Sequence, residues 1–140
     1  MSDFVGFAKS PKLPAEAEQL VLELDVESPL PIDSAAKTLF SKDGAFGWLG
    51  ETSKFDLAPG GKIITDELTF TVTEVTLPKT VRLVCEELGE VHFSLRKGSD
   101  GCAASIRFSR WALPADTEKF WQTARTLSAR LQQILEVNVG

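Results

Sequence analysis

The feature that most constrains the fold is an apolar stripe near the end of the chain. Apolar side chains recur there at i, i+4, i+7, i+11 and i+14, namely Phe120, Ala124, Leu127, Leu131 and Ile134. This spacing is typical of an amphipathic helix of about 20 residues, which would be about 30 Å long. Asp116 is the expected N-cap of this helix. Because one face of the helix is apolar, the rest of the chain must supply an apolar surface of matching length.

The segments before this helix alternate apolar and polar side chains, as half-buried strands do. The alternation is clearest where Leu68, Phe70 and Val72 share one face and threonines occupy the other. Similar patterns predict strands over residues 20–26, 55–58, 62–65, 81–88, 91–97 and 102–113. Turns rich in glycine and proline separate several of these segments. The middle of the chain is therefore expected to form an antiparallel sheet.

One or two short helices are expected after the first strand. The first would begin with Asp33 as its N-cap and end at Gly44, and residues 45–50 would form a further helical turn. The element order predicts an α+β fold in which a curved antiparallel sheet wraps around the long C-terminal helix. Such a fold usually leaves a space between helix and sheet that can hold an apolar ligand. Residues 20–140 are predicted to be one domain and residues 1–19 a leader.

The composition offers few groups for chemistry, with one histidine, two cysteines and no tyrosine. Multi-histidine zinc sites and most iron–sulfur sites are therefore excluded, and no metal is expected. No phosphate-binding or dinucleotide-binding motif is present, so no cofactor is expected. The net charge of −5 argues against nucleic-acid binding. The sequence lacks a long apolar run and a secretory signal, which predicts no membrane span and a cytoplasmic location.

Four motifs occur along the chain in a characteristic order. They are Trp48-Leu49-Gly50, Phe55-Asp-Leu-Ala-Pro-Gly-Gly-Lys, Thr73-Glu-Val-Thr-Leu-Pro-Lys-Thr-Val-Arg-Leu and Val91-His-Phe-Ser-Leu. Together they resemble the START-like (SRPBCC) superfamily. More narrowly, residues 20–137 are similar to bacterial homologues of the C-terminal domain of the heat-shock ATPase activator. The resemblance implies a helix-grip fold, with six or seven antiparallel strands around the last helix. The superfamily includes lipid carriers, hormone receptors, polyketide cyclases and co-chaperones.

The predicted ligand site is a cavity between the long helix and the sheet. Its expected lining consists of Trp48, Phe55, Phe70, Val72, Leu83, Cys85, Phe93, Ile106, Phe108, Phe120, Trp121, Ala124 and Leu127. Strict alternation also points Glu74 and Arg110 inward, where they could orient a ligand or pair with each other. A bulge or twist at the strand end would instead turn them to solvent. The aromatic residues either line a cavity or fill a core, and the sequence leaves both open.

The remaining reactive side chains have simple expected roles. His92 is expected on the outer face of the sheet, so no catalytic residue is predicted. Cys85 and Cys102 lie on strands separated by another strand, about 10 Å apart, which is too far for a disulfide bond. Both are expected to be buried thiols.

The leading hypothesis is a domain that binds a small hydrophobic molecule without catalysis. One alternative is a protein-interaction module that resembles the heat-shock ATPase activator and has a chaperone partner. The other is an aromatase or cyclase type of enzyme, which would need an acid–base pair in the cavity.

Overall fold

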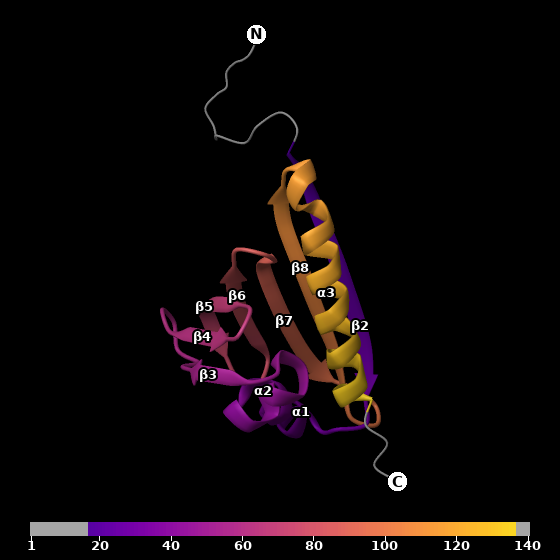
Figure 1. The fold of residues 1–140 in the computed structure, drawn as a ribbon. Helices are drawn as coiled ribbons and strands as arrows, with labels where there is room; N and C mark the ends of the chain where they lie inside the picture. Colours follow the sequence, from indigo (N-terminus) through magenta and orange to yellow (C-terminus); the bar gives the residue numbers. More distant parts are fainter. Residues whose placement is uncertain (1–16, 137–140) are drawn as a thin grey trace.

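The structure is a computed structural model that describes residues 17–136, without the side chain of Phe46. Its elements are β2 (Glu18–Ser28), α1 (Ile32–Phe40), α2 (Lys42–Leu49), β3 (Thr52–Phe55), β4 (Lys62–Thr65), β5 (Thr69–Thr76), β6 (Thr80–Cys85), β7 (Gly89–Lys97), β8 (Cys102–Ala112) and α3 (Pro114–Leu135). The strands form one antiparallel, seven-stranded sheet in the order β2-β8-β7-β6-β5-β4-β3 (Figure 1). The predicted α+β class and helix-grip arrangement are confirmed.

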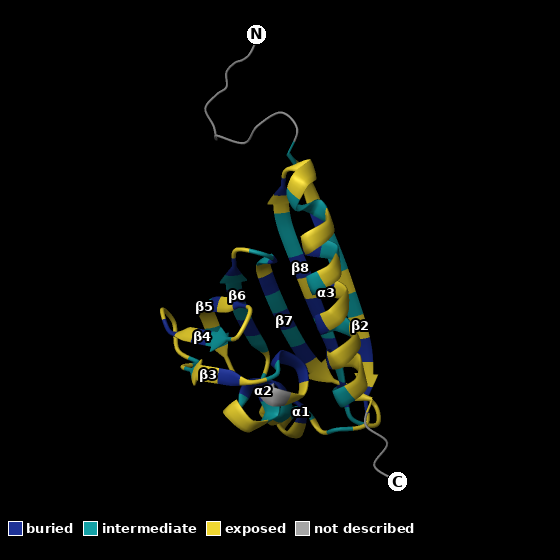
Figure 2. Cartoon of the chain, in the orientation of Figure 1, coloured by how far each residue is buried: buried dark blue, intermediate teal, exposed yellow. Residues whose placement is uncertain are grey.

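The long helix α3 lies along β2 and β8 and also contacts α2 (Figure 1). Its buried stripe consists of Phe120, Ala124, Leu127, Leu131 and Leu135, so Leu135 replaces Ile134 as the last buried position. On the sheet, buried positions alternate with more exposed ones along β7 and β8 (Figure 2). The two apolar faces meet in one contiguous core. Within the described residues, no helix combines the length and the apolar character needed to cross a bilayer.

The predicted helix N-caps are wrong. The helix α3 begins at Pro114 and has Leu113 as its N-cap, while Asp116 lies in the first turn. Proline suits this position because its fixed φ is helical and the first turn needs no N–H donor from it. The N-cap of α1 is Pro31, and Asp33 lies in the first turn of that helix.

The sequence predicted that the first helix ends at Gly44, and this prediction is wrong. The helix α1 already ends at Phe40, and Gly44 lies in the first turn of α2. The Ser41 hydroxyl accepts a hydrogen bond from the Gly44 N–H at 3.0 Å, which is the N-cap interaction. A Cβ atom on Gly44 would overlap the backbone of Thr38. Glycine is therefore needed here for close packing of α2 against α1.

The predicted leader is too long at its C-terminal end. Glu18 and Gln19 already belong to β2, where they pair with Ala112 and Trp111 of β8. The prediction for residues 1–16 lies outside the described residues.

Gly89 at the start of β7 has a φ of +70°. A Cβ atom on it would overlap the carbonyl oxygen of Ser109 on β8. We expect Gly89→Ala to lower the free energy of unfolding by about 2 kcal/mol or more, from the left-handed backbone and from displacement of β8. Gly60→Ala is the matched control, because Gly60 has a φ of +86° but open space around it. Urea denaturation gives the free energy of unfolding of both variants. An equal decrease for Gly89→Ala and Gly60→Ala would contradict the importance of the contact with β8.

Candidate functional site

The predicted cavity lining is a tightly buried cluster. Its members that are buried in the core are Trp48, Phe70, Val72, Leu83, Cys85, Phe93, Ile106, Phe108, Phe120, Ala124 and Leu127, whereas Phe55 and Trp121 are partly buried against it. At its centre, the ring of Phe93 contacts Phe40 and Trp48 edge to face, at centroid distances of 5.1 and 5.2 Å. The Trp48 indole N–H donates to the Leu39 carbonyl at 3.0 Å. This packing favours the core interpretation, and a ligand-binding role for these residues stays a prediction.

Glu74 does not point inward. The pairing of β5 with β6 shifts register between Val72 and Glu74, because Val72 pairs with Leu83 while Glu74 already pairs with Arg82. Thr73 is the extra residue of this bulge, so the alternation reverses after it. Glu74 is therefore exposed and forms an ion pair with Arg82 at 3.1 Å.

Arg110 is half-buried at the end of β8, and it does not pair with Glu74. Its guanidinium donates to the Glu87 carbonyl at 3.2 Å and lies 3.6 Å from the carboxylate of Asp116. Arg110 thus connects β8 to the turn after β6 and to the first turn of α3. These contacts give it a structural role that the sequence pattern did not indicate.

The single histidine lies on the outer face of the sheet, as predicted. His92 pairs across the strands with Arg82 on one side and Arg107 on the other. Arg82 contacts Glu74, and Arg107 lies 3.8 Å from Glu23, so a charged row crosses this face. Burial, and then the nearby Arg82 guanidinium, lower the pKa of His92. This position, on the face opposite α3, supplies no base to the space between helix and sheet.

Cys85 and Cys102 are both free and buried, as predicted. Burial raises the pKa of the Cys85 thiol from 9.0 to about 11. A thiol with a raised pKa stays protonated and is a poor nucleophile.

The raised pKa of Cys85 predicts a loss of stability at alkaline pH. Above pH 9 the thiol of the unfolded chain loses its proton, whereas the folded chain keeps it up to about pH 11. The free energy of unfolding should therefore fall by up to about 1.4 kcal/mol per pH unit in this window. Urea denaturation at pH 8, 9 and 10 should give a steeper fall for the wild type than for Cys85→Ala. Identical pH dependence in the two proteins would show that this thiol is not responsible.

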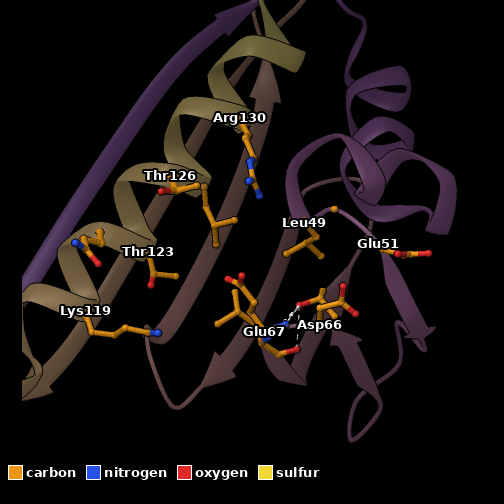
Figure 3. Close-up of a pocket in the computed structure, with 13 residues that line it drawn as sticks. Leu49, Glu51, Asp66, Glu67, Lys119, Thr123, Thr126 and Arg130 are labelled. Carbon is orange, nitrogen blue, oxygen red and sulfur yellow. Dashed lines mark hydrogen bonds between the residues drawn. The ribbon is translucent and has the colours of Figure 1, made fainter.

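A groove of about 350 Å³ lies at the edge of the helix–sheet interface (Figure 3). We call it the α3 groove. It is lined by Leu49, Gly50, Glu51, Thr65, Asp66, Glu67, Leu68, Lys119, Gln122, Thr123, Thr126, Leu127 and Arg130. One wall is α3, and the other consists of the α2–β3 connection and the β4–β5 turn. Its apolar part is formed by Leu49, Leu68 and Leu127, and Leu127 is the one predicted site residue that lines it.

The wall formed by α3 is a polar stripe with a cation at each end. Lys119, Thr123, Thr126 and Arg130 recur at i, i+4, i+7 and i+11, so they lie on one side of the helix. Eleven residues of helix place the Cα atoms of Lys119 and Arg130 about 16 Å apart. Arg130 also donates to the backbone carbonyl of Trp48 at 3.5 Å, which connects α3 to α2.

The opposite side of the groove carries the acidic residues Glu51, Asp66 and Glu67, and Figure 3 shows the Glu51 carboxylate directed away from α3. The β4–β5 turn is held by Thr65, whose N–H donates to the Leu68 carbonyl at 2.8 Å. The Thr65 hydroxyl in turn accepts a hydrogen bond from the Leu68 N–H at 2.9 Å. Within residues 17–136, none of these carboxylates forms an ion pair with a cation of α3. Asp66 and Glu67 in the β4–β5 turn therefore lie across the groove from the cations of α3, without an ion pair between the two sides.

Sequence reasoning missed this groove although one signal of it was present. In the sequence, Asp66 and Glu67 look like ordinary turn charges, and Arg130 lies outside the apolar stripe of α3. The signal was the polar stripe from Lys119 to Arg130, which repeats the spacing of the apolar stripe one residue earlier. The opposite wall could not be found in this way, because it is assembled from two separate connections.

Comparisons with known proteins support the fold. No family model matches the sequence, and no curated protein matches it. Among solved structures, protein MLL2253 from Mesorhizobium loti is similar with a TM-score of 0.67 and 16% identity, over 83% of this chain and 96% of that one. Protein BH1534 from Bacillus halodurans gives 0.66 and 20%, over 84% and 99%. The Aha1 dimer from Colwellia psychrerythraea gives 0.64 and 18%, over 88% and 99%. At these identities, the similarity establishes a shared START-like fold and nothing further.

Proposed function

We propose that the chain from β2 onward is a single START-like domain that binds a small, partly apolar molecule in the α3 groove. The observation that supports this proposal is the groove itself, which combines three leucine side chains with a polar rim between the C-terminal helix and the sheet. Ligand sites in proteins are typically concave, with an apolar part and a few polar groups that fix orientation. The sequence predicted a ligand site inside the core, whereas this proposal places the site in the groove at the edge of the core.

The size of the groove limits the ligand. Ligand pockets measure roughly 300–1,000 Å³, and the α3 groove, at about 350 Å³, lies near the lower end of that range. A single short hydrocarbon chain fits this volume better than a lipid with two long chains. The side chains of Leu49, Leu68 and Leu127 are each less than a tenth exposed, so they offer little apolar surface for a ligand to cover. The polar walls must therefore provide part of the affinity.

A binding experiment tests this proposal directly. Trp48 is adjacent to Leu49 in the chain and accepts the hydrogen bond from Arg130, so its fluorescence should respond to a ligand in the groove. We would titrate a Trp111→Phe, Trp121→Phe variant with four octyl amphiphiles: octyl glucoside, octanoate, octyltrimethylammonium and octyl dimethylglycine betaine. Saturable binding below the micelle concentration of at least one probe is expected, with retention in native mass spectra. Failure of all four to bind would contradict the proposal.

A second candidate function is a protein-interaction module on the outer face of the sheet. The observation that favours it is Trp111, which is 52% exposed on the same face as Arg107. Exposed aromatic side chains beside charged residues are common at protein interfaces. The similar Aha1 dimer is heat-shock ATPase activator-like, which is compatible with a chaperone partner. Capture of the purified heat-shock ATPase by the wild type, but not by Trp111→Ala or Arg107→Glu, would support this candidate. Equal capture by all three would count against this face.

An enzymatic role of the cyclase type has less support. It would need an acid–base pair beside the ligand, and His92 lies on the opposite face of the sheet. A cytoplasmic location stays a prediction from the sequence.

A further inference from the structure

We propose that the α3 groove selects ligands that carry both an anionic and a cationic group, with a short apolar part between or beside them. This inference rests on the proposed function, because it specifies the ligand class of the same groove. It follows from the opposite charges of the two walls. The α3 wall supplies the cations Lys119 and Arg130, and the β4–β5 turn on the other side supplies Asp66 and Glu67.

The cationic wall can receive an anionic group most readily at the Lys119 end, because Arg130 already donates to the Trp48 carbonyl. The Lys119 and Arg130 side chains extend from α3 toward the opposite wall (Figure 3). Their Cα atoms are about 16 Å apart along the helix, so the two cations mark opposite ends of this wall. Lys119 offers an ammonium with three donors, and Arg130 offers a planar guanidinium that matches a carboxylate or phosphate. The Thr123 and Thr126 hydroxyls lie between the two cations and can hydrogen-bond neutral polar groups.

The backbone of the acidic wall is held by hydrogen bonds. Asp66 and Glu67 are consecutive in the β4–β5 turn, and this turn is fixed by the hydrogen bonds between Thr65 and Leu68. Because this backbone is already ordered, ligand binding has to order only the two side chains, which lowers the entropic cost of binding. The attraction between a ligand ammonium and these carboxylates strengthens when the ligand displaces water, because the screening between the charges falls.

The charged side chains of the two walls do not form ion pairs with each other in the described residues. In the part of the chain that the structure describes, the ion pairs are Arg82–Glu74, Arg107–Glu23 and Arg110–Asp116, and none of these residues lines the groove. A purely anionic ligand would lie near the carboxylates of Asp66 and Glu67, and a purely cationic ligand would lie near the two cations of α3. A ligand with both charges meets an opposite charge on each wall, so it avoids both sources of repulsion.

The four octyl probes named above also test this inference. Octyl dimethylglycine betaine should bind about tenfold or more tightly than octanoate, octyltrimethylammonium or octyl glucoside at low ionic strength. The advantage should shrink in 0.5 M salt, because the groove is open and salt screens exposed charges.

Charge reversal at one end of the α3 wall provides a sharper comparison. Lys119→Glu should weaken betaine binding about tenfold and strengthen binding of octyltrimethylammonium. Arg125→Glu is the matched control, because it makes the same change of net charge on the same helix, and Arg125 does not line the groove. It should leave the order of the four affinities unchanged. Circular dichroism and urea denaturation would confirm that both variants fold.

The outcomes separate this inference from the proposed function. If octyl glucoside binds as tightly as the betaine and Lys119→Glu changes no affinity, the charge selectivity is wrong while the groove remains a ligand site. If one singly charged probe binds most tightly, the requirement for both charges is wrong. If none of the four probes binds, the proposed function fails and this inference fails with it.

Discussion

Phe93→Ala is expected to lower the free energy of unfolding by about 3–5 kcal/mol, the usual cost of removing a fully buried aromatic ring. Phe93 is 0% exposed and lies at the centre of the core, in edge-to-face contact with Phe40 and Trp48. Each such aromatic pair adds about 0.5–1.5 kcal/mol beyond the burial of area. Since domains of this size are stable by about 5–15 kcal/mol, this loss would remove a large fraction of the total stability.

Phe93→Leu is the appropriate control for this prediction. Leucine keeps much of the apolar volume, so the loss should be clearly smaller than for alanine. Chemical denaturation of the three proteins in urea would give both values. A loss of less than about 1 kcal/mol for Phe93→Ala would contradict a packed interior, because a ring at the border of a large empty cavity leaves fewer contacts to lose.

Thr126→Trp is expected to weaken ligand binding by about a hundredfold, which corresponds to about 2.7 kcal/mol. Thr126 lines the α3 groove between Lys119 and Arg130, and its side chain is exposed. An indole at this position would occupy a large share of a groove of about 350 Å³. Because the site is exposed, the stability of the fold should change by only about 0.5 kcal/mol.

The matched control for the groove-filling variant is Ala129→Trp. Ala129 is also exposed on α3 but does not line the groove. Fluorescence of an attached dye, or calorimetry, should replace tryptophan fluorescence as the readout, because both variants add an indole. If both substitutions weaken binding equally, the effect is not specific to the groove. If Thr126→Trp binds as the wild type does, the ligand is not in the groove.

The regular elements were predictable because their side-chain periods differ clearly. Alternation in the strands, and the stripe from Phe120 to Leu131, indicated a sheet wrapped around a long helix. The helix ends were less predictable. The helix α3 begins at Pro114, although Asp116 was the predicted N-cap. The N-cap of α1 is Pro31, although Asp33 was predicted. Local capping preferences are worth only about 1 kcal/mol, so tertiary packing readily overrides them.

The site was harder to predict than the fold for two physical reasons. Alternation placed Glu74 inward, but the bulge at Thr73 reverses the side-chain direction, and single residues leave no periodic signal of such a bulge. Aromatic residues suggested a lined cavity, yet large rings such as Phe93 equally fill a core. The polar wall of the groove could have been recognised from the spacing of Lys119 and Arg130. Its acidic wall depends on how two distant connections come together, which only the tertiary structure shows.

The most direct test of the central claim is mapping of the ligand by NMR. Amide chemical shifts of the labelled protein would be followed during titration with octyl dimethylglycine betaine. The account predicts that the largest changes cluster at residues 49–51, 65–68 and 119–130, which surround the α3 groove. Changes confined to the outer face around Arg82, His92 and Arg107, or centred on core residues such as Phe70 and Phe108, would contradict binding in the groove.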